Sequence, residues 1–131
     1  MSNIVYVHAY TNDSEIQREL IRFFSRINEG KIKGEIGGLT RLEPVLVPEK
    51  LEELVAQHPL KFKDLLNQYP FEGLGIWTEW SQTEDIGAFY GSELHKGFIK
   101  YAHTTLDRAW YLVAHFVDDK PKIREIKKNS Q

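Results

Sequence analysis

One amphipathic stretch near the N-terminus constrains the fold more than any other part of this sequence. Between residues 13 and 29, apolar side chains recur every three or four positions, which is the spacing of one helix face. The apolar positions are Ile16, Leu20, Phe23, Phe24 and Ile27. Just ahead of them, Asn12 and Glu15 have the spacing of a capping box at a helix start. A helix with one apolar face must bury it, so we expect a long helix over about 13–29 packed on a second layer.

Several stretches favour β-strands and would supply that second layer as a sheet. Residues 3–10 and 109–117 are apolar or aromatic at nearly every position, which is typical of central strands covered on both faces. Residues 39–47 contain Pro44, and residues 122–128 mix apolar with charged side chains, so both are expected at sheet edges. The remaining expected strands cover residues 74–80, 86–90 and 98–106. Consecutive strands joined by short turns pair antiparallel.

Two shorter helices are expected between the strands at 39–47 and 74–80. Pro48 followed by acidic residues is typical of a first helical turn, and the apolar spacing predicts helices over about 48–57 and 60–69. The length of 131 residues suits one domain, with residues 129–131 as a short polar tail. The predicted fold is a single α+β domain, residues 1–131, with a mainly antiparallel sheet of about five to six strands.

The absence of cysteine narrows the chemistry open to the chain. It excludes disulfides, thiolate nucleophiles and cysteine-ligated zinc or iron–sulfur centres. The N-terminal residues lack the features of a signal peptide, and no run approaches the roughly 18 apolar residues of a membrane span. We therefore expect a cytoplasmic protein with no membrane partner. Because no metal-binding or nucleotide-binding motif is present, we predict neither a cofactor nor a metal.

Charge is distributed unevenly along the chain, although the net charge is only −2. Residues 43–93 carry ten acids and three bases, a net −7, and residues 94–131 carry eight bases and four acids, a net +4. A domain that binds duplex nucleic acid usually has a concentrated basic face, whereas the larger excess here is negative. The acidic middle therefore favours a basic protein as the partner over nucleic acid.

Three of the five histidines lie on expected strands and suggest an enzymatic alternative. If His8, His103 and His115 converge, their rings would act as general acid and base on a phosphodiester. Lys100 or Arg108 would then hold the phosphate. This interpretation requires the three histidines to share a cleft. Because no catalytic motif exceeds a chance match, we expect the chain not to be an enzyme.

Two tryptophans and a group of acids suggest a surface that binds a partner. Trp77 and Trp80 lie on opposite faces of an expected strand, so either both are buried or one is exposed beside the acids. An exposed aromatic side chain beside carboxylates is typical of a hot spot for a basic partner. The residues expected to bind the partner are Glu49, Glu52, Glu53, Trp77, Glu79, Trp80, Glu84 and Asp85.

These observations favour a small cytoplasmic binding protein that neutralises a basic protein partner, such as an immunity protein that inhibits a nuclease toxin. Two alternatives stay open. One is a phosphoesterase or RNase-type enzyme that uses the histidines. The other is a nucleic-acid-binding module built on the basic C-terminal strands, with Tyr101, Trp110 and Tyr111 as stacking platforms. Homodimerisation through an edge strand is compatible with each of them.

Overall fold

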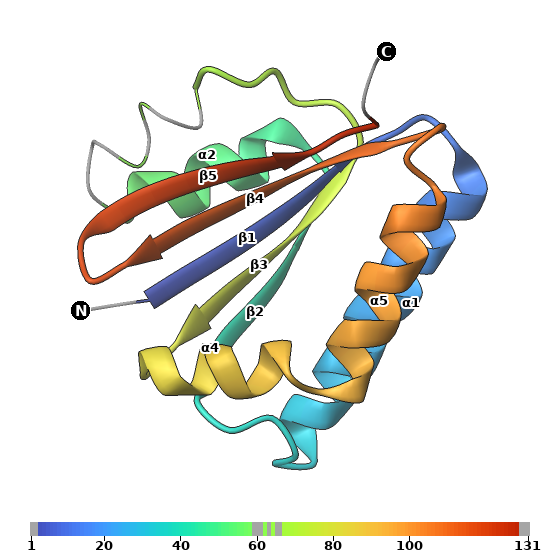
Figure 1. Ribbon diagram of the computed structural model, residues 1–131. Coiled ribbons are helices and arrows are strands. Elements are labelled where there is room, and N and C mark those ends of the chain that lie inside the picture. Colours follow the sequence, from blue (N-terminus) through green and yellow to red (C-terminus); the bar gives the residue numbers. More distant parts are fainter. Residues whose placement is uncertain (1–2, 59–61, 63, 65–66, 129–131) are drawn as a thin grey trace.

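Five antiparallel strands form one sheet in the computed structural model, which describes residues 3–58, 62, 64 and 67–128 (Figure 1). The strands are β1 (Asn3–Tyr10), β2 (Leu39–Val45), β3 (Leu74–Trp80), β4 (Trp110–Val117) and β5 (Lys120–Ile126). Their order across the sheet is β2-β3-β1-β4-β5, and every pairing is antiparallel. The predicted α+β class with an antiparallel sheet is therefore confirmed.

The central and edge positions follow from the chemistry of each strand. β1 lies in the middle between β3 and β4, and seven of its eight residues are buried, as expected from its two apolar faces. β2 and β5 are the edges, as their proline and charges predict. Pro44 has no N–H to donate, and β2 pairs with β3 alone, so the loss is tolerated there.

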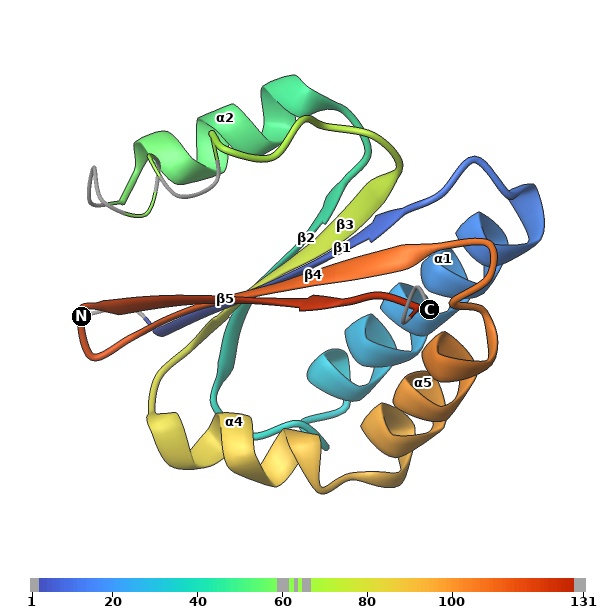
Figure 2. The same ribbon diagram turned by 45° about the horizontal axis from the view of Figure 1, so that its top comes forward.

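Helices cover both faces of the sheet. The described helices are α1 (Ser14–Ile32), α2 (Pro48–Ala56), α4 (Thr83–Tyr90) and α5 (Glu93–Thr104). Figure 2 shows α1, α4 and α5 on one face and α2 on the other. The sheet thus separates two buried clusters, one containing Val5 and Trp80 beneath α1 and one containing Tyr6 and Trp77 beneath α2. In the described part of the chain, no helix combines the length and the apolar character needed to cross a membrane.

The long N-terminal helix and the first short helix are confirmed, with one correction at a cap. α1 buries Ile16, Leu20, Phe23 and Ile27, four members of the predicted apolar face. Its N-cap is Asp13, whose carboxylate accepts hydrogen bonds from the backbone N–H groups of residues 15 and 16. Asn12, the predicted cap, lies one residue too early and donates to the Glu72 carboxylate instead. α2 begins at Pro48, as predicted.

The expected strands at 86–90 and 98–106 are wrong, because these residues form α4 and most of α5. Ser92 caps α5 by accepting a hydrogen bond from the backbone N–H of His95, which starts a helix rather than a turn between strands. The apolar positions of α5 are Leu94, Phe98, Ile99 and Ala102. Their spacing of four, one and three residues is helical, but the aromatic and β-branched content of the segment favours a strand.

Two other predictions cannot be compared with the fold in full. The second short helix was expected over about 60–69, and five of these ten positions lie outside the described residues. The polar tail at 129–131 lies wholly outside them.

Candidate functional site: an apolar cavity with a basic mouth

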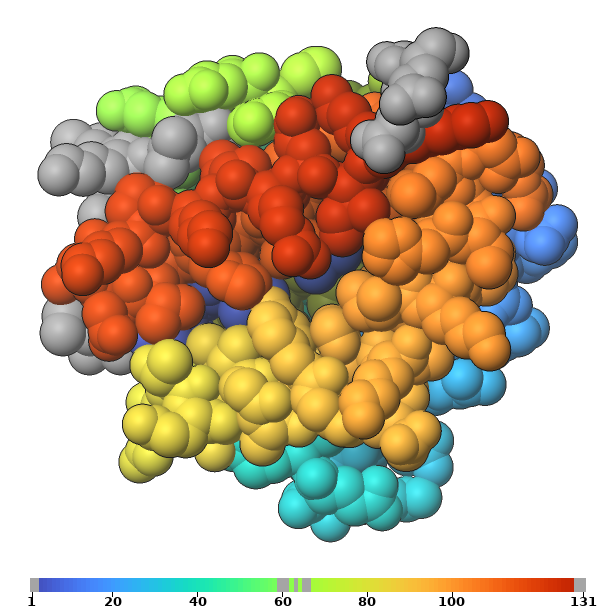
Figure 3. Space-filling view, viewed as in Figure 1, coloured from blue at the N-terminus to red at the C-terminus, as the bar shows by residue number. Residues whose placement is uncertain are grey.

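A cavity of about 560 Å³ lies between the sheet and the α4–α5 side of the helical layer. Its floor comes from β1, β3 and β4, and its walls come from α1, α4, α5 and β5. Figure 3 shows it as a hollow between the red and orange strands and the yellow and orange helices, with blue β1 atoms visible in its depth. The cavity is therefore open to solvent on this face.

One wall of the cavity is formed where α5 packs on α1 through an aromatic stack. Phe98 of α5 stacks on Phe23 of α1, with ring centroids 4.2 Å apart and planes 10° apart. α1 in turn packs on β2 and β3, the far half of the sheet. The cavity-facing side chains of β1 and β4 include the short Val5, Val7 and Val113, with the larger Tyr111 and His115 on either side of Val113 along β4. The valines are too short to fill the space between these strands and α5.

Most of the lining is apolar. Aliphatic and aromatic side chains from both strands and helices line it, and they include Val5, Val7, Ile76, Phe98, Val113 and Ile126. Walls of this composition favour an apolar ligand, because binding removes apolar surface from water.

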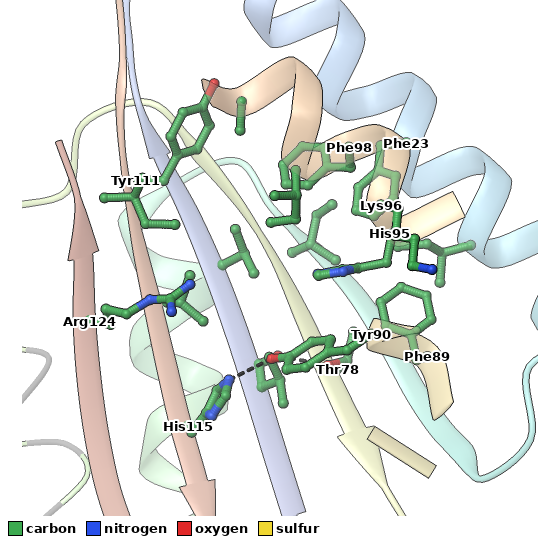
Figure 4. Close-up of a pocket in the computed structure, with 18 of the residues that line it drawn as sticks. Phe23, Thr78, Phe89, Tyr90, His95, Lys96, Phe98, Tyr111, His115 and Arg124 are labelled. Atoms are coloured by element: carbon green, nitrogen blue, oxygen red, sulfur yellow. Dashed lines mark hydrogen bonds between the residues drawn. The ribbon is translucent and has the colours of Figure 1, made fainter. Parts of the chain in front are cut away.

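One end of the cavity is polar. There Tyr90 of α4 and His115 of β4 form a hydrogen bond of 2.5 Å between the hydroxyl and Nε2, as Figure 4 shows. His95 of α5 stacks against Tyr90, with ring centroids 4.5 Å apart. Burial raises the pKa of Tyr90 to about 12. Burial also lowers the pKa of His115, and the nearby Arg124 and Lys122 lower it further, so this ring is neutral at neutral pH.

Every charged side chain in the described lining is basic. Lys96 and Lys100 come from α5, and Lys122 and Arg124 come from β5. None of the four forms an ion pair with a described residue. Strand register places Lys122 directly across from His115, and Arg124 follows two residues later on the same face. The mouth is thus positive in a chain whose net charge is −2.

The three histidines do not share a cleft, so the condition for the enzymatic alternative is not met. His8 packs on the α2 side of the sheet, where it contacts Tyr10 and Phe71. His115 lies on the opposite face, in the cavity. His103 is on α5 rather than on a strand, and its side chain is exposed. Alternation along β1 and β4 explains the separation, because His8 pairs with Leu112 and therefore shares its face.

The two tryptophans do lie on opposite faces, and both are buried. Trp77 is 0% exposed and Trp80 is 2% exposed. Their indole N–H groups donate to the Glu79 carboxylate and the Thr78 hydroxyl, respectively. The alternative with one exposed tryptophan is therefore wrong, and neither ring is available to a partner.

The predicted acids lie in three separate places. Glu49, Glu52 and Glu53 are exposed on α2, whereas Glu84 and Asp85 begin α4 on the other side of the sheet (Figure 2). A third position, Glu79, is held between the Arg41 guanidinium and a tryptophan N–H, and its side chain is only 13% exposed. The acids thus form no single continuous surface.

The stacking platforms of the nucleic-acid alternative are also largely enclosed. Tyr111 is 2% exposed and hydrogen-bonds to Thr105. Trp110 is half-buried and stacks on Tyr10, with centroids 3.9 Å apart, while Lys127 covers it. The exposed aromatic face that this alternative requires is not formed by these residues.

Sequence reasoning missed Tyr90, His95, Lys96 and Arg124 as members of one site. The signal for the β5 side was present, because Lys122 and Arg124 alternate on one strand face. The helical signal of α5 was hidden by its strand-like composition.

Comparison with known proteins gives no further guide. The chain matches no protein-family model, and neither a curated protein nor a solved structure matches it. Among the described residues, no group of three or more histidine and carboxylate side chains is placed to hold a metal ion. The function must therefore be argued from the geometry of the cavity.

Proposed function

We propose that this chain is a binding protein for a small, largely apolar molecule that occupies the cavity above β1 and β4. The observation that carries the proposal is the cavity itself, at about 560 Å³ with mainly apolar walls. Sites for small molecules typically span about 300–1,000 Å³ and combine apolar walls with a few polar groups. Here the polar groups are gathered at one end, around Tyr90 and His115.

The packing of the rest of the chain supports a functional origin for this space. Protein interiors are close-packed, and unfilled volume costs contacts. On the other side of the sheet, the cluster of Tyr6, Trp77 and Phe116 is packed by large rings that are all at most 4% exposed. The chain can thus fill a sheet face with large side chains, yet the residues of β1 and β4 beneath the cavity include three valines.

Binding can be tested with 1-decanol and decanoate, followed by calorimetry and by chemical-shift changes in ¹⁵N-labelled protein. Val113→Trp should fill the cavity and weaken binding of both probes more than about tenfold, since a core-sized ring excludes the chain of the ligand. Val47→Trp makes the same change at an exposed site before α2 and should leave binding unchanged.

Folding of Val113→Trp is checked by circular dichroism, and Ile99→Trp fills the same space from α5. If neither probe shifts the resonances of cavity residues in the wild type, the proposal is wrong. Equal binding by wild type and both filled variants would also contradict it.

The α2 surface supports a second candidate, a cytoplasmic protein that neutralises a basic protein partner. Glu49, Glu52 and Glu53 are exposed at helical spacing on one face of α2. Just before the helix, Leu46 and Val47 are 54% and 50% exposed. An apolar centre beside charged groups is typical of a protein interface.

This candidate is tested by changing the three α2 glutamates to Gln and measuring salt-dependent capture of a basic protein from lysate. The matched control changes three other exposed glutamates, Glu29, Glu35 and Glu93, to Gln and has the same net charge. Loss of capture only in the α2 variant is expected. Equal capture by both variants would rule out a specific acidic surface.

A further inference from the structure

The polar end of the cavity presents several hydrogen-bond donors and no carboxylate among its described residues. Lys122 and Arg124 approach from β5, His115 from β4, and Tyr90 from α4. In Figure 4 the Arg124 side chain lies beside His115 and extends toward the cavity. Uncompensated cations next to an apolar space attract an anion that carries an apolar body.

We infer that the ligand is an apolar carboxylic acid, bound as its carboxylate between Arg124 and His115, and that its binding places a proton on His115. This inference rests on the proposed function, since it names the ligand class of the same cavity. The apolar body lies along the valines and Phe98, and the anionic end faces β5.

A carboxylate suits this end better than a phosphate. The planar guanidinium of Arg124 offers paired N–H donors that match the two oxygens of a carboxylate. A carboxylate carries one charge, so it costs less to remove from water into mainly apolar walls than a phosphate dianion. Lys122, directly across from His115, adds a second cation at the solvent side.

The charged and titratable groups around His115 determine how the site responds to protons. β5 contributes Lys122 and Arg124, α4 contributes Tyr90, and α5 contributes His95 with Lys96 and Lys100. The lining residues of β1, β3 and α1 include Val5, Thr78 and Phe23 and carry no titratable group. His115 is therefore surrounded by cations and neutral groups.

An anion in this setting changes the protonation of His115. Without a ligand, burial and the two β5 cations keep its pKa below the ordinary value. A carboxylate beside the ring favours the charged form and raises the pKa. The complex then holds one more proton than the free protein, so binding tightens as the pH falls. Between the two pKa values the dissociation constant falls by up to about tenfold per pH unit.

The ligand class is tested with decanoate, 1-decanol and decyl phosphate, which share one chain length and differ in the head group. We expect decanoate to bind most tightly, and Arg124→Met to weaken decanoate by more than about tenfold without weakening decanol. Lys128→Met removes an exposed cation that does not line this cavity and should leave both affinities unchanged.

The outcomes separate this inference from the proposed function. If decanol binds as tightly as decanoate, the anionic class is wrong while the cavity still binds a ligand. If decyl phosphate binds more tightly, the carboxylate assignment is wrong. If none of the three binds, the proposed function itself fails.

Proton uptake is tested by following the His115 ring resonances through a pH titration with and without decanoate, over about pH 5.5–8.5, where the carboxylate stays ionised. An upward shift of the His115 pKa on binding is expected. In parallel, His115→Asn should retain binding but lose the pH dependence of the dissociation constant, whereas His103→Asn, at an exposed position on α5, should keep it. An unchanged His115 pKa, or a pH dependence that persists in His115→Asn, would overturn the proton step.

Discussion

Acidification should destabilise this protein through His8, a buried histidine on the α2 side of the sheet. His8 is only 1% exposed. Both nitrogens of its ring have hydrogen-bond partners. Nε2 donates to the Glu72 carbonyl oxygen at 2.7 Å, because a carbonyl can only accept. Nδ1 is then the acceptor for the Tyr6 hydroxyl at 2.5 Å. The network therefore holds a neutral ring in one tautomer.

The size of the effect follows from the pKa of His8, which burial lowers from 6.5 to about 4. Between these values the unfolded chain binds more protons than the folded one, so the free energy of unfolding falls as the pH falls. Each pKa unit corresponds to about 1.4 kcal/mol, so the full loss is about 3 kcal/mol, with about 2 kcal/mol already lost at pH 5. Above about pH 6.5 His8 should contribute no pH dependence.

Urea unfolding at pH 7 and pH 5 measures this loss directly. In the wild type, His8 should contribute about 2 kcal/mol to the fall in the free energy of unfolding between pH 7 and pH 5. In His8→Phe this contribution should be absent, so the fall should be smaller by about that amount. The variant loses two hydrogen bonds at every pH, so the informative quantity is the pH difference and not the absolute stability. His103→Asn should retain the wild-type difference, since the side chain of His103 is exposed. Identical pH differences in wild type and His8→Phe would refute the argument.

Two further predictions concern the backbone and a buried hydroxyl. Gly73→Ala should destabilise the protein much more than Gly34→Ala in thermal unfolding. Both glycines have a positive φ, so a side chain is strained at either position. At Gly73, however, the new methyl group would also clash with a backbone atom, the Ala9 carbonyl oxygen. The strain at Gly34 alone should cost about 1 kcal/mol, and equal costs at the two sites would contradict the steric argument. Thr78→Val removes the hydroxyl that accepts the hydrogen bond from the buried Trp80 N–H. The free energy of unfolding, measured by chemical denaturation, should therefore fall by about 1–3 kcal/mol. An unchanged free energy of unfolding would contradict the assigned hydrogen bond.

The parts of the fold that sequence could predict are those where local pattern and tertiary environment agree. The apolar face of α1 recurs at helical spacing and is buried as a unit, and Pro44 is at an edge because it lacks an N–H. α5 was misread because residues that favour strands, such as Phe98 and Ile99, occupy a helix whose start depends on one serine cap. A cap of this kind outweighs weak local propensity only once the apolar face has a partner to pack on.

The candidate site was harder to predict because it depends on which elements lie side by side. The sequence indicates that His115 is chemically useful, but it suggests His8 as a neighbour, which alternation places on the other face. Its actual partner, Tyr90, is 25 positions earlier on a helix that was expected to be a strand. The alternation of residues within one strand predicts which face of the sheet a side chain occupies. Predicting which side chains from different segments touch also requires the order of the strands and the placement of the helices.

The uneven distribution of charge along the sequence corresponds to an uneven distribution of charge around the cavity. The C-terminal region, residues 94–131, carries eight bases and four acids, and four of those bases line the cavity. None of the four acids of this region lines the cavity. Asp107 follows α5, and Asp118 and Asp119 form the turn between β4 and β5. Glu125 is paired with Leu112, on the other face of the sheet. Alternation along β5 therefore sorts charge by sign, with cations toward the cavity. The C-terminal region thus supplies the basic mouth, while the stack of Phe98 on Phe23 joins α5 to α1 at the apolar wall.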